Sequence, residues 1–305
     1  MIIACGEALI DMLPRTATTG EPAFAPHAGG SVFNTAVALG RLGADAGFFA
    51  GLSTDMMGAI LAARLDESGV DHSLCARSAR PTTLAFVQLQ DGQASYAFYD
   101  ENTAGRMLSP DDLPPSGAGR AWFFGGISLV AEPCGSTYDA LQAREAPHAV
   151  TVLDPNIRPG FITDEGAHRT RIGRMSARAD IVKVSDEDLH WIMGPGDPGD
   201  LAREMLARGP SLVCLTEGAR GARGFTQQGE VRVPGPEVAV VDTVGAGDTF
   251  NAGLLVALDR AGRLTKPALA ALDSVALGEA LALGVRAAAV TVSRAGANPP
   301  WRNEL

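Results

Sequence analysis

Short apolar runs alternate with helix-like stretches along almost the whole chain, and this alternation constrains the fold more than any other feature. The strand-like runs are MIIACG, DAGFFAGL, RAWFFGGI, AVTVLD, ADIVKVS, SLVCLT and AAAVTVS, the last covering residues 287–293. The stretches with helical apolar spacing are NTAVALGRLG, MGAILAARLDESG, STYDALQARE, SDEDLHWIMG and DLAREMLARG. Apolar strands that alternate with helices indicate a mainly parallel sheet covered on both faces. The sequence therefore predicts a three-layer α/β/α fold.

Two segments break this rhythm, residues 13–28 and residues 81–100, because neither contains a helical pattern. The second alternates apolar and polar residues around Asp91-Gly92, a pair typical of a hairpin turn. A small, half-exposed sheet of this kind is either a surface hairpin or a lid that keeps water from a site. The chain has no long linker. We therefore expect a single domain over residues 1–305, with a lid formed by about 13–28 and 81–104.

The net charge limits the kinds of partner that the protein is expected to bind. The net charge of −10 argues against a nucleic-acid surface and gives no support to membrane binding. The first residues, MIIACGEALID, lack a basic leader, and Glu7 and Asp11 interrupt their apolar run. No other apolar run reaches about 18 residues, the length that a membrane span requires. We expect a cytoplasmic protein.

Several chemistries are excluded by residue spacing. The four cysteines form no CxxC pair, so neither a zinc site nor a disulfide framework is expected, and Cys5 and Cys214 fall inside apolar runs as buried thiols do. No HExxH motif is present. The two lysines, Lys183 and Lys266, do not follow a glycine, which excludes a P-loop. Any phosphate chemistry must therefore use another architecture.

The stretch VAVVDTVGAGDTFNAGLLVAL, residues 238–258, offers such an architecture. VAVV has the pattern of a short strand, and TFNAGLLVAL has apolar residues at helical spacing. Between them, Gly245-Ala246-Gly247-Asp248 forms a tight turn whose N–H groups open the helix. Unpaired donors and a partial positive charge make such a terminus a phosphate site. The alternative is that Asp248 or Thr249 only caps the helix.

Polar residues also follow most of the predicted strands, where open parallel sheets bind ligands. Asp11, Gly30 and Asn34 together are typical of a polyol clamp, although an asparagine near a helix start is often a cap. Arg158 could hold a phosphate or a substrate oxygen, or form a surface ion pair. The remaining strand ends carry Asp154, Asn156, Lys183, Ser185, Asp188, Thr216, Gly218 and Gly221. This convergence indicates a ligand site at the carboxyl edge of the sheet.

GGSVFNTA and DTVGAGDTFNAG resemble the paired signatures of the PfkB, or ribokinase-like, sugar kinases. The resemblance is collinear over nearly the whole chain and includes GLSTDMMG (Gly51, Asp55, Gly58), DPNIRP, KVSDEDL, LTEGARGA and VSRAGA. The segments GEALIDMLP, FYDENTAGRML, FFGGISL and DPNIRP are most similar to fructokinases. The resemblance implies a ribokinase-like fold with a small β-sheet lid. It also implies transfer of a phosphoryl group from ATP to a sugar hydroxyl, giving fructose 6-phosphate from D-fructose.

The resemblance also implies roles for individual residues. Asp248 would be the base that accepts the hydroxyl proton, and the N–H groups of Gly245, Ala246 and Gly247 would form the anion hole for the γ-phosphoryl group. The sugar would be held by Asp11, Gly29, Gly30, Asn34, Asn102 and Arg158, with Phe98 covering it. The nucleotide side would be lined by Lys183, Ser185, Thr216, Gly218, Gly221 and Gly247. Asp188 would organise Mg²⁺ through water.

Three positions depart from the family pattern. Ser185-Asp186-Glu187-Asp188 stands where many members have Asn-x-x-Glu, and Val285 replaces an asparagine near the adenine. Many members also bind a monovalent cation beside the anion hole, and here Asp242, Val244, Arg294 and Gly296 are placed to bind K⁺. The serine ligand of some relatives is replaced near Pro300.

Other functions stay open. Within the class these are a 2-keto-3-deoxygluconate kinase, for which Arg106 and Arg158 would face the carboxylate, a ribokinase and a riboside kinase. A non-catalytic sugar or nucleotide sensor on the same fold is the alternative from another class, and the presence of Asp248 argues against it. A serine hydrolase is disfavoured because Val130 breaks the GxSxG pattern around Ser128. An exposed lid edge would be covered by a second copy, so we expect a homodimer.

Overall fold

A computed structural model describes residues 1–90 and 93–305, so the predicted turn at Asp91-Gly92 lies outside the described residues. Its main sheet has nine strands in the order β15 (Gly229–Val233), β14 (Ala222–Thr226), β13 (Leu212–Thr216), β12 (Ile181–Ser185), β11 (Val150–Asp154), β10 (Ala121–Gly125), β1 (Ile2–Cys5), β4 (Ala46–Phe49) and β6 (Val70–Asp71). Strands β13 to β6 run parallel, whereas β14 pairs in the antiparallel sense with both β13 and β15. The expected mainly parallel sheet is confirmed.

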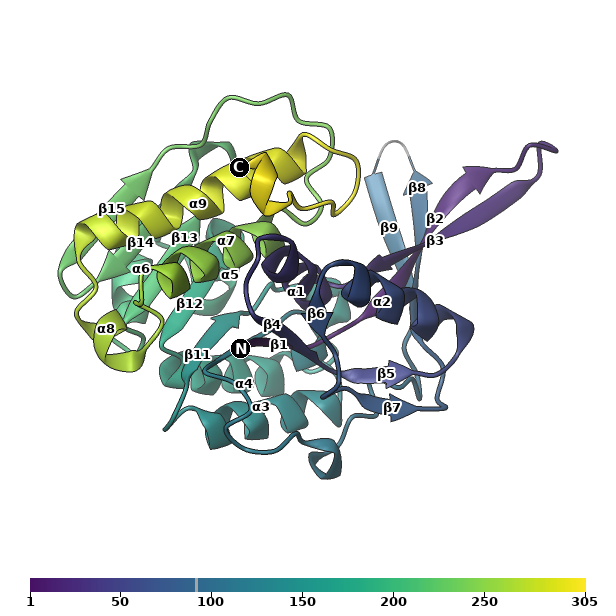
Figure 1. The fold of residues 1–305 in the computed structure, drawn as a ribbon, viewed down its shortest axis with the longest axis horizontal. Coiled ribbons are helices and arrows are strands. Elements are labelled where there is room, and N and C mark those ends of the chain that lie inside the picture. Colours follow the sequence, from purple (N-terminus) through teal and green to yellow (C-terminus); the bar gives the residue numbers. More distant parts are fainter. Residues whose placement is uncertain (91–92) are drawn as a thin grey trace.

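Helices cover both faces of this sheet (Figure 1). One face packs against α1 (Ser31–Arg41), α2 (Met56–Glu67), α7 (Ala246–Arg260), α8 (Lys266–Ala270) and α9 (Ser274–Val292). The other packs against α3 (Cys134–Glu145), α4 (Glu165–Arg178), α5 (Asp186–Met193) and α6 (Pro198–Leu206). Strand β1 serves both layers, because Ile2 and Ala4 face the first group while Ile3 and Cys5 face the second. The three-layer α/β/α fold is therefore confirmed.

A separate four-stranded sheet projects from the main body (Figure 1). Its order is β3 (Pro22–Gly29), β2 (Leu9–Thr16), β8 (Thr83–Gln90) and β9 (Gln93–Tyr99). Strands β2 and β3 form one antiparallel pair, β8 and β9 form another, and β2 joins them in parallel to β8. At its base, β5 (Gly51–Ser53) pairs with β7 (Ala76–Ser78). The two segments without helical patterns thus form one small sheet.

Two predicted strands are wrong. Residues 287–293 carry β-branched residues, but residues 287–292 continue α9, in which the Thr291 hydroxyl donates to the Ala287 carbonyl and to Thr249 Oγ1 on α7. Packing of α9 on α7 overrides the β propensity of this segment. Residues 238–241 form no strand, and Val240 is 64% exposed. Their only described backbone tie is the Val241 N–H, which donates to the Val292 carbonyl at 2.8 Å.

Helix α9 is the one helix in the described part of the chain that is long and apolar enough to cross a membrane. A single such helix is weak evidence for a membrane span. This one packs against α7 and against β14 and β15, as a core helix does. Its composition is explained by that packing.

Candidate active site

A cleft of about 1070 Å³ opens at the carboxyl edge of the main sheet. The small sheet borders one end of it, where Asp11 and Phe98 lie, and α9 borders the other, where Val285 and Val292 lie. Between them stands the start of α7 with Gly247 and Asp248. The predicted convergence of strand ends is therefore present in the structure.

Helix α7 begins at the glycine turn that the sequence singled out. Gly245 caps it with φ of +78°, a left-handed conformation that glycine adopts without strain. The Ala246 N–H makes a long contact of 3.4 Å with the Thr243 carbonyl. Within the described residues, no group accepts from the N–H groups of Gly247 and Asp248. This terminus therefore presents free donors and the positive end of a helix dipole to the cleft.

Asp248 lies in the first turn of α7 and is only 7% exposed. Its Oδ2 accepts a hydrogen bond of 3.0 Å from Asn34 Nδ2, which comes from the first turn of α1. Burial raises the pKa of Asp248 to about 7, although the Asn34 bond opposes the shift. A carboxyl group with such a pKa is suited to exchange a proton near neutral pH.

A buried cation lies directly behind this turn. Lys183 Nζ, on β12, donates to Asp154 Oδ2 at 3.0 Å, and the two residues are 5% and 2% exposed. Asn251 Nδ2 of α7 donates to the same oxygen at 2.7 Å. Burial lowers the pKa of Lys183, but the negative charges of Asp154 and Asp188 outweigh it and the net shift is upward. The ammonium lies 3.1 Å from where a Cβ of Gly247 would stand, so its charge reinforces the α7 terminus.

The start of α1 opens on the same cleft but is already filled. Glu7, which follows β1, accepts from the Ser31 N–H at 2.9 Å and from the Ser31 hydroxyl at 2.7 Å. Its other oxygen accepts from the Ser128 N–H at 3.2 Å. A carboxylate therefore occupies the anion position of α1, whereas the N–H groups of Gly247 and Asp248 at the α7 start have no acceptor among the described residues.

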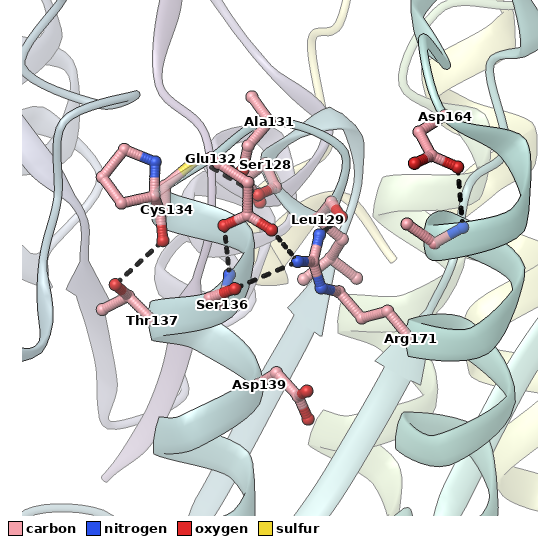
Figure 2. Close-up of polar contacts among 12 residues, drawn as sticks. Ser128, Leu129, Ala131, Glu132, Cys134, Ser136, Thr137, Asp139, Asp164 and Arg171 are labelled. Atoms are coloured by element: carbon pink, nitrogen blue, oxygen red, sulfur yellow. Dashed lines mark hydrogen bonds and ion pairs between the residues drawn. The ribbon is translucent and has the colours of Figure 1, made fainter.

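The turn that contains Ser128 is held in place by Arg171. Arg171 of α4 donates to the Leu129 carbonyl at 2.7 Å, and it also contacts Glu132 and Ser136 at the start of α3 (Figure 2). The neighbouring Ile127 lines the cleft. Arg171 thus fixes the loop that closes this wall.

The end of the cleft beside the small sheet combines acidic, basic and aromatic groups. Burial raises the pKa of Asp11, on β2, to about 6. Phe98 of β9 meets Phe161 edge to face, with ring centroids 4.1 Å apart. Arg158 and Asn156 line the same wall, and Asn156 has a φ of +45°, a conformation that asparagine tolerates better than most residues. Polar groups on an aromatic floor are typical of sugar sites.

The opposite end is largely aliphatic. Its walls include Val238, Val240, Val285, Ala288 and Val292. The predicted glycines Gly218 and Gly221 and the hydroxyl residue Thr216 border this half, and Ser185 and Asp188 stand beside them. An apolar slot of this kind suits a flat group such as a nucleobase.

Asp188 is held by the backbone. Its Oδ1 accepts from the Ile157 N–H at 2.8 Å and its Oδ2 from the Ser185 N–H at 3.4 Å. Burial and the nearby Asp154 raise its pKa. In the described part of the chain, no group of three or more His, Cys, Asp or Glu side chains is arranged to hold a metal.

Some predicted residues lie outside the cleft. Gly29 lies behind Asp11, where a Cβ would overlap the Asp11 carboxylate. Asn102 lines a separate surface hollow with Arg106 and Glu132, and its side chain accepts from Arg80.

The residues predicted for a monovalent cation lie in different surroundings. Val244 lines the cleft, and Arg294 pairs with Glu304. The Asp242 carboxylate accepts from the N–H groups of Val244 and Gly296 at 3.0 and 2.9 Å.

Other residues of the site were given no role from sequence. Glu7 lies two residues after β1 and Asp154 is the last residue of β11, so both stand at strand ends, where the strand-end rule expects ligand contacts. Asn251 and Phe161 carry no sequence signal, because their roles depend on contacts with Asp154 and Phe98 from distant segments.

The chain matches the pfkB family of carbohydrate kinases over residues 1–304, and it belongs to that family. It is 57% identical over 278 residues to a fructokinase from Rhizobium leguminosarum bv. trifolii, across 91% of this chain and 85% of the relative. Its fold is similar to that of aminoimidazole riboside kinase from Salmonella enterica complexed with aminoimidazole riboside and an ATP analog, with a TM-score of 0.86, 27% identity, and 99% and 97% of the two chains covered. A fructokinase from Vibrio cholerae O395 in fructose, ADP and calcium ion bound form is also similar, with a TM-score of 0.83, 25% identity, and 97% and 94% coverage. The family resemblance drawn from the sequence is confirmed.

Proposed function

We propose that the protein transfers the γ-phosphoryl group of ATP to D-fructose, giving fructose 6-phosphate and ADP. One observation carries the proposal: a buried carboxyl group, Asp248, lies beside unpaired N–H donors at a helix start inside a cleft with a polar end and an apolar end. The 57% identity to a fructokinase supports fructose as the sugar.

In the proposed reaction the sugar lies against Asp11, Asn34, Arg158 and Phe98, and the base of ATP lies in the aliphatic half of the cleft. Asp248 accepts the proton of the attacking hydroxyl group as its oxygen bonds to the γ-phosphorus. The bond from that phosphorus to the bridging oxygen breaks, and ADP leaves. Free N–H groups at the α7 start and the Lys183 ammonium stabilise the charge on the phosphoryl oxygens.

We propose Mg²⁺ as the metal that accompanies ATP, with Asp188 and Ser185 holding its water ligands. Magnesium supplies charge neutralisation on the phosphates. We also propose that K⁺ binds near Val244, because the Asp242 carboxylate accepts from the N–H groups of Val244 and Gly296 and so holds the two segments side by side.

The catalytic rate is expected to depend on Asp248 ionisation. Because burial raises its pKa to about 7, the basic form is lost as pH falls through neutrality. At saturating fructose and Mg²⁺-ATP, kcat should rise with pH through about 7 and then level off, with a slope of one proton. A pH profile from 5.5 to 9 measures this, and a rate that stays flat between 6 and 8 would contradict the assignment.

The function is tested by ADP release with Mg²⁺-ATP against fructose, 2-keto-3-deoxygluconate, ribose, adenosine and glucose. Turnover with fructose above all other sugars is the expected result. A riboside kinase is the second candidate, because the similar Salmonella enterica kinase binds a riboside, and turnover with adenosine alone would favour it. Sugar binding without any turnover would favour a sensor.

We further propose that two copies associate through the small sheet, whose outer strands β3 and β9 each pair along one edge only within the described residues and leave the other edge open. Light scattering that shows only a single-chain mass would contradict this. We propose the cytoplasm as the location of the protein, because the proposed reaction uses ATP and a free sugar.

A further inference from the structure

The segment GLSTDMMG holds three residues, Gly51, Asp55 and Gly58, that the proposed reaction does not use. All three lie where the small sheet joins the main body, around β5 and the start of α2 (Figure 1). Their contacts give them a common task.

Asp55 connects two elements at once. As the N-cap of α2, its Oδ1 accepts from the Gly58 N–H at 2.7 Å. The same oxygen accepts from the Thr82 hydroxyl at 2.6 Å, and Oδ2 accepts from the Thr82 N–H at 2.8 Å. Thr82 immediately precedes β8. One carboxylate therefore ties the start of the β8–β9 hairpin to a helix of the main body.

The two glycines permit this close approach. A Cβ on Gly58 would overlap the Ser53 carbonyl oxygen, and a Cβ on Gly51 would overlap the Ala104 carbonyl oxygen. Ala104 follows β9, so it belongs to the other end of the hairpin.

The two ends of the hairpin are also joined to each other. The Ala104 N–H donates to the Pro81 carbonyl at 2.9 Å, and the hydroxyl groups of Thr83 and Thr103 lie 2.9 Å apart. The contacts of Gly51, Asp55 and Gly58 thus hold both ends of β8–β9, a set that we name the hairpin clasp.

The hairpin clasp holds the ends of the two strands that reach the sugar end of the cleft. Strand β9 carries Phe98 to that end, and β8 pairs with β2 so that Ala85 stands opposite Asp11. The nucleotide end is formed by other elements, among them α9. A shift at the clasp would therefore move groups at the sugar end and leave the nucleotide end in place.

We propose that Asp55 is a positioning residue, which holds the β8–β9 hairpin at the angle that brings Phe98 and Asp11 over the sugar. The catalytic readout of this inference rests on the proposed function. Asp55 touches neither substrate, so its effect on the reaction is transmitted through Thr82.

Three variants test the proposal. Asp55→Ala removes the helix cap and the ties to Thr82, whereas Thr82→Val removes only the hydroxyl tie and leaves the cap intact. Asp197→Ala is the matched control, because Asp197 caps α6 by accepting from the Gly199 and Asp200 N–H groups at 2.9 and 3.1 Å and has no hydrogen bond to the small sheet among the described residues.

Asp55→Ala is expected to speed amide hydrogen exchange in β8 and β9 while exchange in the main sheet stays at the parent rate. Its KM for fructose should rise about tenfold while its KM for ATP changes less than about threefold. Thr82→Val should shift both readouts in the same direction by less, and Asp197→Ala should shift neither.

Equal exchange and equal KM values in Asp55→Ala and Asp197→Ala would overturn the proposal, as would equal rises in the two KM values. If Asp55→Ala does not fold, parent-like exchange and KM values in Thr82→Val would overturn it. Should the parent protein turn over no sugar, the proposed function fails, and hydrogen exchange alone still decides whether the clasp holds the hairpin.

Discussion

Replacing Asp248 by asparagine is expected to lower kcat for fructose phosphorylation by about 10²–10⁴-fold, the contribution of a placed proton acceptor. Asparagine keeps the shape of the side chain, and Asn34 can still contact it, but the amide cannot take the hydroxyl proton. Fructose and ATP should bind with near-parent affinity, because the N–H groups of α7 and the walls of the cleft are unchanged. Single-turnover kinetics with calorimetric binding measures both quantities.

A stability measurement separates lost chemistry from lost fold. Since burial raises the pKa of Asp248 to about 7, the folded protein binds its proton more tightly than the unfolded chain does. The charged carboxylate therefore lowers the free energy of unfolding. This loss grows as pH rises from about 4 to about 7 and is constant at higher pH. Asp248→Asn removes the loss, so at pH 8 its Tm should equal or exceed that of the parent. A fall in both Tm and kcat would show that the loss of kcat comes from misfolding.

Replacing Lys183 by methionine is expected to lower the free energy of unfolding by about 3–5 kcal/mol, because it leaves the Asp154 carboxylate buried without a cation. Asn251 would still donate to Asp154, but Asp154 Oδ1 has no partner within the described residues. Urea unfolding without ligands measures the change. The double variant Lys183→Met with Asp154→Asn contains no buried charge at this position and should regain part of the loss.

The chain provides its own control in its second lysine. Lys266 Nζ donates to the Asp180 carboxylate at 2.7 and 2.8 Å, but its side chain is 34% exposed. An ion pair in partial contact with water contributes about 0–1 kcal/mol, so Lys266→Met should change stability little. Similar losses in the two single variants would contradict the view that burial of the Lys183 pair sets its importance.

The layers of the fold could be predicted from sequence because strand and helix patterns alternate with little ambiguity. The errors fall where tertiary packing decides. Residues 287–292 carry a strand pattern but extend α9 along α7, and in the segment 238–241 the side chains of Val238 and Val240 line a cleft rather than a core. Neither reason can be found in a window of ten residues.

The candidate site could be predicted where its residues follow the rule that open parallel sheets bind ligands at the carboxyl ends of their strands. That rule, together with the family motifs, placed Asp11, Lys183 and Asp248 in one cleft. The family resemblance implied that Asn102 holds the sugar, whereas in the structure its side chain accepts from Arg80 and lines a separate surface hollow. It also gave no role to Glu7, which fills the α1 terminus through contacts with Ser31 and Ser128.

The sugar end of the cleft is divided between the small sheet and the main body, and this division has a consequence for the cell. Asp11 and Phe98 belong to the small sheet, whereas Asn34 and Asp248 belong to the main body. In the proposed complex, a sugar that contacts all four residues would link its own binding to the relative position of the small sheet and the main body, so binding and closure would form a single equilibrium. ATP would contact the other end of the cleft and would leave that equilibrium unchanged. An enzyme of this design would respond to the supply of sugar, and a molecule with nucleotide alone would not complete the enclosure in which the reaction takes place.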